Sequence, residues 1–162
     1  MPDIDKRLIA GVRTVVAVFR EFEQAARGSS MSVAQYRILL FLRKGPKRAG
    51  QLAWEASVRK PSITPVIATL ERNGWVRREA DPEDRRSSRL TISTEGLKRM
   101  RSFEARLAHV IDQALTGPER EPVLDGLDML HHLLAATKEE RFRRLEQEIL
   151  DDNGAGSQSQ EA

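Results

Sequence analysis

One segment indicates the fold of this chain more directly than any other: Asp81-Pro-Glu-Asp-Arg-Arg-Ser-Ser-Arg-Leu-Thr-Ile-Ser-Thr-Glu-Gly96. Its proline and acidic pair, at 82–84, are typical of a turn, and short β-like stretches lie on either side, at residues 74–79 and 88–92. Two strands joined by a polar loop predict a hairpin with an arginine pair at its tip. Exposed charges add little stability, whereas arginines commonly enter the narrow, electronegative minor groove of DNA. The segment therefore favours a nucleic-acid contact.

Four amphipathic helices are predicted before the hairpin. Apolar residues three and four apart predict them at residues 5–27, 32–43, 48–57 and 61–73. The third and fourth would form a helix-turn-helix that ends directly before the hairpin. The sequence thus predicts a mainly α protein with a small β-hairpin, in which residues 32–93 form a winged helix-turn-helix DNA-binding domain.

Two long helices are predicted after the hairpin. Ser93 is a suitable N-cap for a helix at 94–115, and Thr116-Gly-Pro-Glu119 is a capping-box pattern that starts a sixth helix. The same pattern at Thr137-Lys-Glu-Glu140 leaves two alternatives: a separate helix begins there, or the sixth helix continues to about residue 150. Residues 151–162 have little to bury and predict a disordered tail.

The outer helices carry more apolar surface than the small middle domain can cover. The residues that need a partner surface are Phe19, Phe22, Val110, Ile111, Leu115, Leu127, Leu130 and Leu134. Exposing such surface to water costs about 25 cal/mol per Å². Residues 1–31 and 94–150 are therefore predicted to form a helical dimerisation region that covers itself in a homodimer.

The charge of the 162-residue chain is unevenly distributed. Residues 43–101 contain 15 Lys and Arg and 7 Asp and Glu, a net charge of +8, whereas the remaining residues contain 12 and 17, a net of −5. A basic block in a mildly acidic frame is typical of a protein that binds double-stranded DNA. A solvated charged surface, the alternative, would not concentrate the excess in one third of the chain.

Several other classes of protein find no support in the sequence. There are no cysteines for disulfides or thiolate metal sites, and the start of the chain lacks the apolar core of a signal peptide. No apolar run approaches the length of a membrane span, so a cytoplasmic protein is expected. There is no glycine-rich phosphate loop or nucleophile–base pair, and the adjacent His131 and His132 would point about 100° apart on a helix. No enzyme, cofactor or metal site is predicted.

The fourth helix is predicted to enter the major groove. Ile63, Ile67 and Leu70 would face the domain core, and the opposite face carries small and hydroxyl side chains where an ordinary surface helix would carry Glu and Lys. Such side chains suit a close approach to base edges and phosphates. The predicted DNA contacts of this helix are Lys60, Pro61, Ser62, Thr64, Pro65, Thr69 and Arg72.

The position of Pro65 depends on where this helix begins. A helix that starts at Pro61 would lack the hydrogen bond from residue 65 to residue 61. With Ser62 as the N-cap, Pro65 would fall in the first turn, where no such donor is needed. The later start, or a distorted first turn, is favoured.

At the hairpin tip, Asp84 is predicted to hold Arg86 in an extended pose, and Arg85 to meet a phosphate. The alternative for the first pair is a plain surface ion pair, worth about 0–1 kcal/mol. The strand arginines, which are Arg77, Arg78 and Arg89, could bind phosphate or could be solvated, and the sequence leaves that choice open.

These motifs resemble the MarR family of bacterial transcriptional regulators. The similar segments are Pro61-Ser-Ile-Thr64, Leu70-Glu-Arg-Asn-Gly-Trp-Val76, Asp84-Arg-Arg86 and Leu90-Thr-Ile-Ser-Thr-Glu-Gly96. The resemblance implies a homodimer on a pseudo-palindromic operator, usually a repressor, and it gives Asp84 and Arg86 the DNA-binding role of the family's wing. This chain departs from the family at Pro65, where a polar or basic DNA contact is common, and in its longer helical extension past Ala136.

The resemblance also implies release from DNA by a small aromatic or phenolic ligand, bound between the dimer helices and the DNA-binding lobe. The corresponding residues here are Arg13, Phe19, Arg20 and Tyr36. Arginine could pair with a carboxylate, and the rings could stack on the ligand. The alternative is that the rings are core and the arginines surface. Two other functional classes stay open, namely a ligand-independent architectural or partner-recruiting protein and, with less support, a sensor enzyme.

Overall fold

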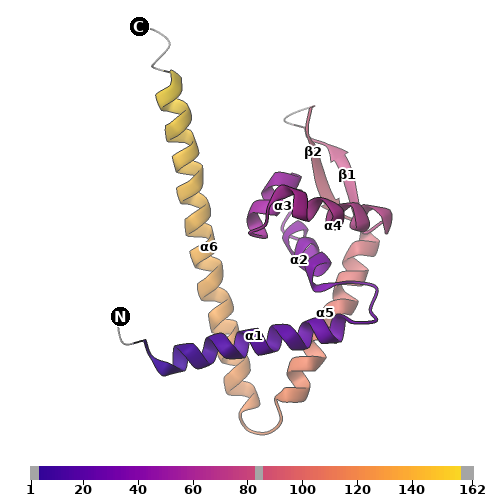
Figure 1. Ribbon diagram of the computed structural model, residues 1–162, viewed down its shortest axis with the longest axis vertical. Coiled ribbons are helices and arrows are strands. Elements are labelled where there is room, and N and C mark those ends of the chain that lie inside the picture. Colours follow the sequence, from indigo (N-terminus) through magenta and orange to yellow (C-terminus); the bar gives the residue numbers. More distant parts are fainter. Residues whose placement is uncertain (1–3, 83–85, 158–162) are drawn as a thin grey trace. The chain divides into compact units, whose positions relative to one another are not determined.

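The computed structural model describes residues 4–82 and 86–157, with side chains described to Thr137 and at Glu140 (Figure 1). Contacts divide the chain into two compact units, Met1–Ala114 and Leu115–Ala162. The first unit contains five helices and the hairpin, and the second contains a single long helix. The fold is therefore mainly α with a small β-hairpin, as predicted.

Helix α1 (Lys6–Ala26) is the predicted first helix. The carboxylate of Asp5 caps it by accepting a hydrogen bond of 2.8 Å from the backbone N–H of Arg7, and the side chain of Arg7 lowers the pKa of Asp5 by hydrogen bonding to it. Gly28, at φ 74°, turns the chain after the helix. Only the C-terminal end of α1 packs on the core, through Phe22, Ala25 and Ala26.

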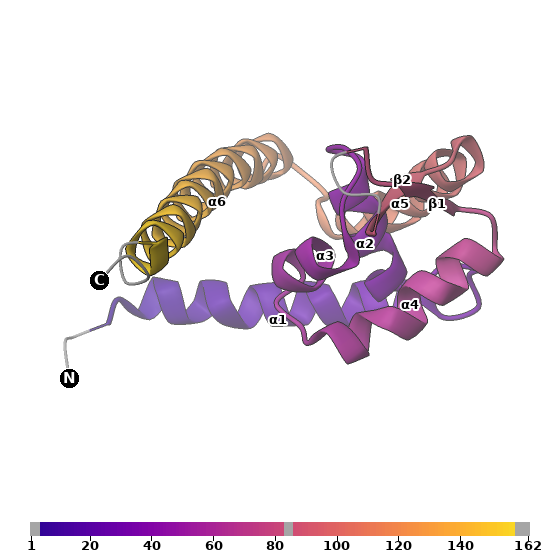
Figure 2. The ribbon, with the colours of Figure 1, turned by 90° about the horizontal axis from the view of Figure 1, so that it is seen from above.

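Three short helices form the centre of the first unit: α2 (Val33–Leu42), α3 (Ala49–Glu55) and α4 (Lys60–Arg72). Ser32 begins α2 with a complete capping box, in which its side chain accepts from Gln35 N–H. Helices α3 and α4 lie side by side (Figure 2). The buried residues of α3, its C-cap and α4 are Leu52, Ala53, Ala56, Ile63, Ile67 and Leu70. The last three are those that the sequence predicts to face the core.

Strands β1 (Val76–Ala80) and β2 (Ser88–Ile92) form the predicted antiparallel hairpin, with Val76 opposite Ile92 and Ala80 opposite Ser88. The hairpin projects beyond α3 and α4 (Figure 1). A bridge that the sequence did not predict joins β2 to the segment before α3, because Lys47 and Leu90 exchange backbone hydrogen bonds of 3.1 and 2.8 Å. The hairpin is therefore attached to both sides of the helix-turn-helix.

Helix α5 (Thr94–Ala114) starts at Ser93, as predicted. The hydroxyl of Ser93 accepts a hydrogen bond of 3.0 Å from Gly96 N–H and donates one of 2.6 Å to the carbonyl of Gly74. This second bond ties the start of α5 to the turn between α4 and β1. Farther along, Arg106 donates to the carbonyl of Ala25, so α5 also holds the end of α1.

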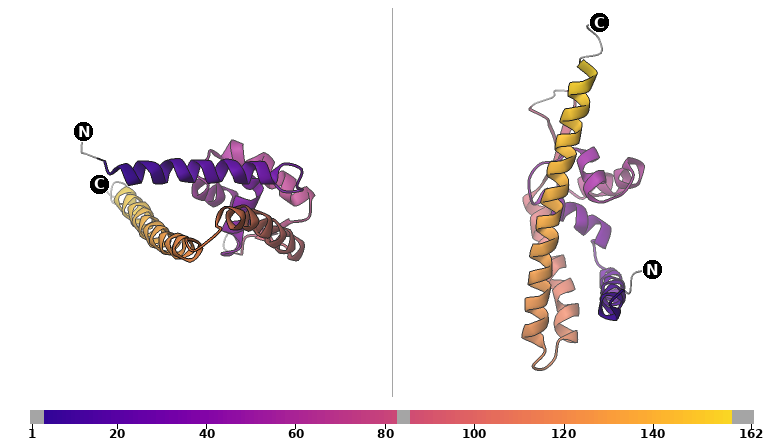
Figure 3. Two further views of the ribbon diagram at one scale, coloured as in Figure 1. Left: turned by 90° about the horizontal axis from the view of Figure 1, so that it is seen from below. Right: turned by 90° about the vertical axis from the view of Figure 1, so that its left-hand side faces the viewer.

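Helix α6 (Arg120–Ser157) forms the second unit (Figure 3). It begins after Gly117, at φ 100°, a few residues later than the capping pattern at Thr116 predicted. It is one uninterrupted helix through Thr137, whose hydroxyl donates to the carbonyl of Leu133 four residues earlier. A threonine caps a helix only where the chain enters from a non-helical conformation, so the continuation alternative is correct here.

The described part of α6 also includes residues 151–157, which the sequence predicts to belong to a disordered tail. Residues of low helix propensity such as Asp, Asn and Gly can extend a helix that is already nucleated, because each added residue then gains one hydrogen bond. Residues 158–162 lie outside the described residues.

Candidate nucleic-acid interface and effector cavity

Helix α4 presents an exposed face opposite its buried residues. The predicted contacts Lys60, Pro61, Ser62, Thr64, Pro65 and Arg72 are exposed, and Thr69 is half-buried. Ile63, Ile67 and Leu70, each no more than 3% exposed, fix the rotation of the helix about its axis. The structure therefore brings all seven predicted residues onto the outer side of one helix.

The favoured position of Pro65 was wrong. The N-cap of α4 is Arg59, Pro61 lies in the first turn, and Pro65 lies inside the helix. Since proline has no N–H, the carbonyl of Pro61 receives no helical hydrogen bond from residue 65. The helix nevertheless starts early, because the N–H of Ser62 donates to the carbonyl of Arg59 at 2.9 Å. Ser62 is thus a helical residue and not the cap.

The threonines of α4 use their hydroxyl protons within the helix. Thr64 donates to the carbonyl of Lys60 at 2.9 Å, and Thr69 donates to the carbonyl of Pro65 at 3.0 Å. Arg72 in turn donates to the Thr69 hydroxyl at 3.2 Å. In this state Thr64 and Thr69 present methyl groups and oxygen lone pairs, which suit thymine methyl groups and donors on base edges.

The turn between α3 and α4 contains a backbone conformation that is rare for a residue with a side chain. Ser57 has φ 55°, the left-handed region. The N–H of the following residue, Val58, donates to the carbonyl of Ala53 at 3.0 Å. These features set the direction in which the chain enters α4.

Only part of the wing tip can be placed. Arg86 is exposed, whereas Asp84 and Arg85 lie outside the described residues, so the orienting role of Asp84 stays a prediction. Two strand arginines have carboxylate partners. Arg78 binds Glu71 of α4 through two hydrogen bonds of 2.9 and 3.1 Å, which raise the pKa of its guanidinium, and Arg89 binds Asp81 at 2.9 Å.

Asp81 directly precedes the turn predicted at residues 82–84, and no role was predicted for it, yet it is 1% exposed. Its carboxylate also accepts a hydrogen bond of 2.6 Å from Arg48, the residue before α3. An aspartate that follows a strand and precedes a proline is typical of an exposed turn. No local pattern therefore indicates that this one is buried between arginines from distant segments.

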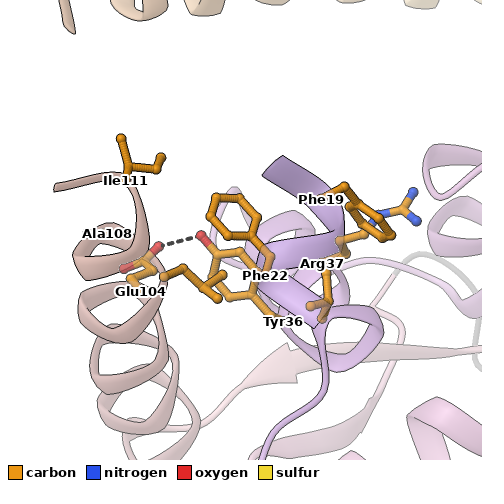
Figure 4. Close-up of a pocket in the computed structure, with 9 residues that line it drawn as sticks. Phe19, Phe22, Tyr36, Arg37, Glu104, Ala108 and Ile111 are labelled. Carbon is orange, nitrogen blue, oxygen red and sulfur yellow. Dashed lines mark hydrogen bonds between the residues drawn. The ribbon is translucent and has the colours of Figure 1, made fainter. Parts of the chain in front are cut away.

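A cavity of about 470 Å³ lies where α1, α2 and α5 meet (Figure 4). Its lining is mostly apolar, with one carboxylate and one guanidinium. The lining residues are Phe19, Phe22, Val33, Tyr36, Arg37, Glu104, Leu107, Ala108 and Ile111. The structure thus brings Phe19 and Tyr36 of the predicted ligand set together in one cavity.

The arginine of the cavity is not one of those predicted. Arg13 and Arg20 do not line it, and Arg20 instead pairs with Glu21 at 3.2 Å. Arg37 lines it, and its guanidinium donates to the carbonyl of Ala56, at the end of α3, at 3.1 Å. Helix periodicity assigns a face but not the neighbours of that face, so the sequence did not indicate Arg37; ligand binding by Arg13 and Arg20 stays a prediction.

Tyr36 and Glu104 form the polar contact of the cavity. The Tyr36 hydroxyl donates to Glu104 Oε1 at 3.2 Å, and its ring lies 5.5 Å from that of Phe103. Burial, together with the charge and hydrogen bond of Glu104, raises the pKa of Tyr36 to about 12. The hydroxyl is therefore neutral at physiological pH and is held as a donor toward the carboxylate.

Two helices expose apolar faces within their own units. On α1 these residues are Leu8, Ile9, Val12, Val15, Val16 and Phe19, and no residue of α1 is buried. On α6 they are Val123, Leu127, Met129, Leu130, Leu133 and Leu134. Phe22, Val110, Ile111 and Leu115, which were also predicted to need a partner surface, are half-buried.

Neither a metal site nor a membrane-spanning helix is found in the part of the chain that the structure describes. Among residues 4–82, 86–137 and 140, whose side chains are described, no group of three or more His, Asp and Glu is arranged to hold a metal ion. Among residues 4–82 and 86–157, no helix combines the length and the apolar character that crossing a membrane requires.

Comparison with known proteins identifies relatives of the chain. Residues 31–88, from α2 to the start of β2, match the sequence model of the MarR family. An HTH-type transcriptional regulator of Mycobacterium leprae is 29% identical over 139 residues, which are 83% of this chain and 97% of that protein. The homoprotocatechuate degradative operon repressor of Escherichia coli is 25% identical over 131 residues, 80% of this chain and 86% of the repressor.

Solved structures share the fold. The transcriptional repressor CouR, bound to a 23-mer DNA duplex, superposes with a TM-score of 0.58 at 23% identity, over 75% of this chain and 89% of CouR. At this level of identity the superposition shows a common fold, and the family match covers the helix-turn-helix and the first strand of the wing.

Proposed function

We propose that this chain represses transcription in the bacterial cytoplasm as a homodimer on a pseudo-palindromic operator. It belongs to the MarR family and is therefore a DNA-binding transcriptional regulator rather than an enzyme. We further propose that a small aromatic or phenolic ligand releases it. One observation carries the first proposal: α4 turns a face of small and hydroxyl side chains outward, next to a projecting wing.

The DNA contacts that we propose combine the two grooves. Lys60, Pro61, Ser62, Thr64, Pro65, Thr69 and Arg72 would meet the major groove and its phosphates, and Asp84, Arg85 and Arg86 would meet the minor groove. Loss of the hydrogen bond between residues 65 and 61 leaves the Pro61 carbonyl as an extra acceptor near the start of α4. Donors on base edges, such as the amino group of cytosine or adenine, are its natural partners.

The homodimer is supported by the apolar faces of α1 and α6. Val12 and Val16 on α1 are 63% and 65% exposed, and Leu133 and Leu134 on α6 are 62% and 61% exposed. Contiguous apolar surface of this kind is rarely left in water by a monomeric protein. A second copy supplies the same faces, as a twofold interface requires.

DNA binding is tested with duplexes from the protein's own promoter region against random duplexes of equal length at physiological salt. We expect a strong preference for the promoter duplex. Arg86→Ala should weaken this binding by about 1–3 kcal/mol, whereas Arg7→Ala, the same charge change on α1, should leave it unaltered. Equal affinity for promoter and random duplexes would instead support an architectural protein, the alternative function.

The effector proposal rests on the cavity between α1, α2 and α5. Phe19, Phe22 and Tyr36 offer rings for stacking, and Arg37 offers a guanidinium for a carboxylate or phenolate. The similarity to a homoprotocatechuate operon repressor adds weak support for a phenolic aromatic ligand. Since Arg37 also binds the Ala56 carbonyl beside the turn into α4, a ligand that recruits its guanidinium would favour one position of α4 over another.

Release is tested by titrating the operator complex with homoprotocatechuate, other aromatic carboxylates and simple phenols. We expect at least one of them to dissociate the complex, and Arg37→Gln to weaken its effect relative to that variant's own basal DNA affinity. Arg13→Ala and Arg20→Ala are the matched controls, because neither arginine lines the cavity. An unchanged response in Arg37→Gln, with a reduced response in either control, would return the effector site to the residues first predicted.

A further inference from the structure

We propose that Asp81 is the positioning residue of the wing: its buried carboxylate binds Arg48 and Arg89 at once and thereby sets the direction of the hairpin tip relative to the helix-turn-helix. The inference rests on the proposed contact between the wing and DNA. It concerns a residue that would not itself touch the nucleic acid.

The geometry joins three segments at one carboxylate. Arg48, which precedes α3, places its Nε 2.6 Å from Asp81 Oδ2, and Arg89, on β2, places its Nε 2.9 Å from Oδ1. Ser87 adds a hydroxyl contact of 3.4 Å to Oδ2. Both oxygens are therefore occupied, one by an arginine of the wing and the other by an arginine of the helix-turn-helix.

The location of the carboxylate makes this contact a directional one. Asp81 directly follows β1, and the last strand pair, Ala80 with Ser88, lies next to it. The N–H of Asp81 donates to the carbonyl of Ser87 at 3.2 Å, which closes the base of the tip. The hydrogen-bonded pair of Asp81 and Ser87 is therefore the point at which the chain enters and leaves the tip.

Because the Asp81 carboxylate is buried, water cannot take the place of the two arginines as its partners. The side chain of Asp81 is 0% exposed, whereas those of Arg48 and Arg89 are 42% and 28% exposed. A buried carboxylate is stable only when paired and hydrogen-bonded, and hydrogen bonds between ionised groups are the shortest and strongest. Since Asp81 and Arg89 both move with the hairpin, rotation of the wing away from α3 would break the pair with Arg48. The carboxylate would then lose one of its two arginines, which is unfavourable for a buried charge.

The backbone bridge between the wing and the segment before α3 lies next to the two arginines. Lys47, adjacent to Arg48, exchanges two backbone hydrogen bonds with Leu90, adjacent to Arg89. Backbone bonds along one strand permit twisting about the strand axis, as in any two-stranded ribbon. A side-chain contact off that axis restrains the twist, and Asp81 supplies it.

The proposal makes a prediction opposite in sign to simple electrostatics. Removing a negative charge from the wing should strengthen binding to the DNA polyanion. If Asp81 positions the tip, Asp81→Asn should instead weaken operator binding, by about tenfold. Glu79→Gln is the matched control: it removes the same charge from the same hairpin, at an exposed position two residues away, and should bind equally or more tightly.

The experiment measures operator affinity of the full-length protein at several salt concentrations, with circular dichroism to verify folding. For Asp81→Asn we also expect hydroxyl-radical protection to be lost where the wing contacts the minor groove, while the protection caused by α4 persists. Folded Asp81→Asn that binds the operator as tightly as the unaltered protein, or more tightly, overturns the proposal.

A second variant and a second measurement keep the test decisive. If Asp81→Asn does not fold, Arg48→Lys retains the charge but loses the Nε contact, and a few-fold weakening is expected; unchanged affinity overturns the proposal. Hydrogen exchange in the absence of DNA should be faster at the amides of residues 86–92 in either variant and unchanged in the centre of α5. If the unaltered protein binds no promoter duplex, the proposed function fails, while this exchange result still decides the role of Asp81.

Discussion

In one copy of the chain, the centre of the first unit is buried far more completely than α1, the outer helix of that unit. It is also buried more completely than α6 in the second unit. Leu39, Leu52 and Leu70 are 0% exposed in the winged helix-turn-helix, whereas Val15 on α1 and Met129 on α6 are 63% and 65% exposed. One copy of the chain therefore completes the core of the winged helix-turn-helix and leaves the outer faces exposed, as the proposed homodimer requires.

The short connections between its elements explain why the winged helix-turn-helix buries its own apolar faces. Its three helices are short and are followed at once by a hairpin, so that each apolar face meets another within a few residues. Helices α1 and α6, of 21 and 38 residues, keep most of their large apolar side chains exposed. The homodimer proposed above would bury these faces.

The largest expected effect comes from placing a charge on the exposed apolar face of α6. Leu127, 44% exposed in one chain, should tolerate aspartate in a monomer but not in a dimer, where an unpaired buried charge costs about 3–5 kcal/mol. We expect Leu127→Asp to convert a dimer of 18.3 kDa chains into monomers at micromolar concentration, as measured by sedimentation. His131→Asp, the same charge at an exposed polar position, should stay dimeric, and a monomeric unaltered protein would contradict the comparison.

The second-largest effect is expected at Gly96, in the buried part of the first unit. A Cβ on this residue would overlap the backbone carbonyl of Trp75, which cannot move away as a flexible side chain could. Gly96→Ala should lower the free energy of unfolding by about 1–3 kcal/mol, measured by urea denaturation. Gly50→Ala in α3 is the control, since nothing lies within 4 Å of its added Cβ. Equal stability of the two variants would show that the start of α5 is loosely packed.

A smaller effect, opposite in sign, is expected at Ser57 in the turn before α4. Its φ of 55° is unfavourable for a residue with a Cβ and free of cost for glycine. Ser57→Gly should therefore raise the free energy of unfolding by about 0.5–1 kcal/mol. The same change at Ser102, exposed in the middle of α5, should lower it by a similar amount. Destabilisation at both positions would show that the turn does not retain this conformation in solution.

The smallest effect concerns the cavity and the ionisation of Tyr36, the single tyrosine of the chain. Its pKa is about 12 in the folded protein, above the value of about 10 expected in the unfolded chain. The resulting stabilisation is complete below pH 10 and is lost as the pH rises from 10 to 12. Phenolate absorbance at 295 nm at pH 11 should be low while the protein remains folded and high in denaturant, and Tyr36→Phe should remove this part of the pH dependence. A folded-state pKa near 10 would mean that Tyr36 in solution has neither the burial nor the contact with Glu104 that together raise its pKa here.

The sequence by itself determined the element order and the family. Helical periodicity placed the inward face of α4, Ser93 was read correctly as an N-cap, and the β-like stretches on either side of residues 82–84 predicted the hairpin. These features depend on contacts between residues close together in the chain, which local pattern records. The start of α4 was misread because proline is compatible with a helix interior wherever the surrounding packing holds the helix together.

Only the tertiary structure decided the contacts between distant segments. It paired Asp81 with Arg48, thirty-three residues away, brought Tyr36 to Glu104 across sixty-eight, and selected Arg37 rather than Arg13 or Arg20 for the cavity. Lys47 joined the wing for the same reason. A helix or strand pattern specifies which face turns inward, but the identity of the facing residue depends on how whole elements pack, and that is a property of the folded chain alone.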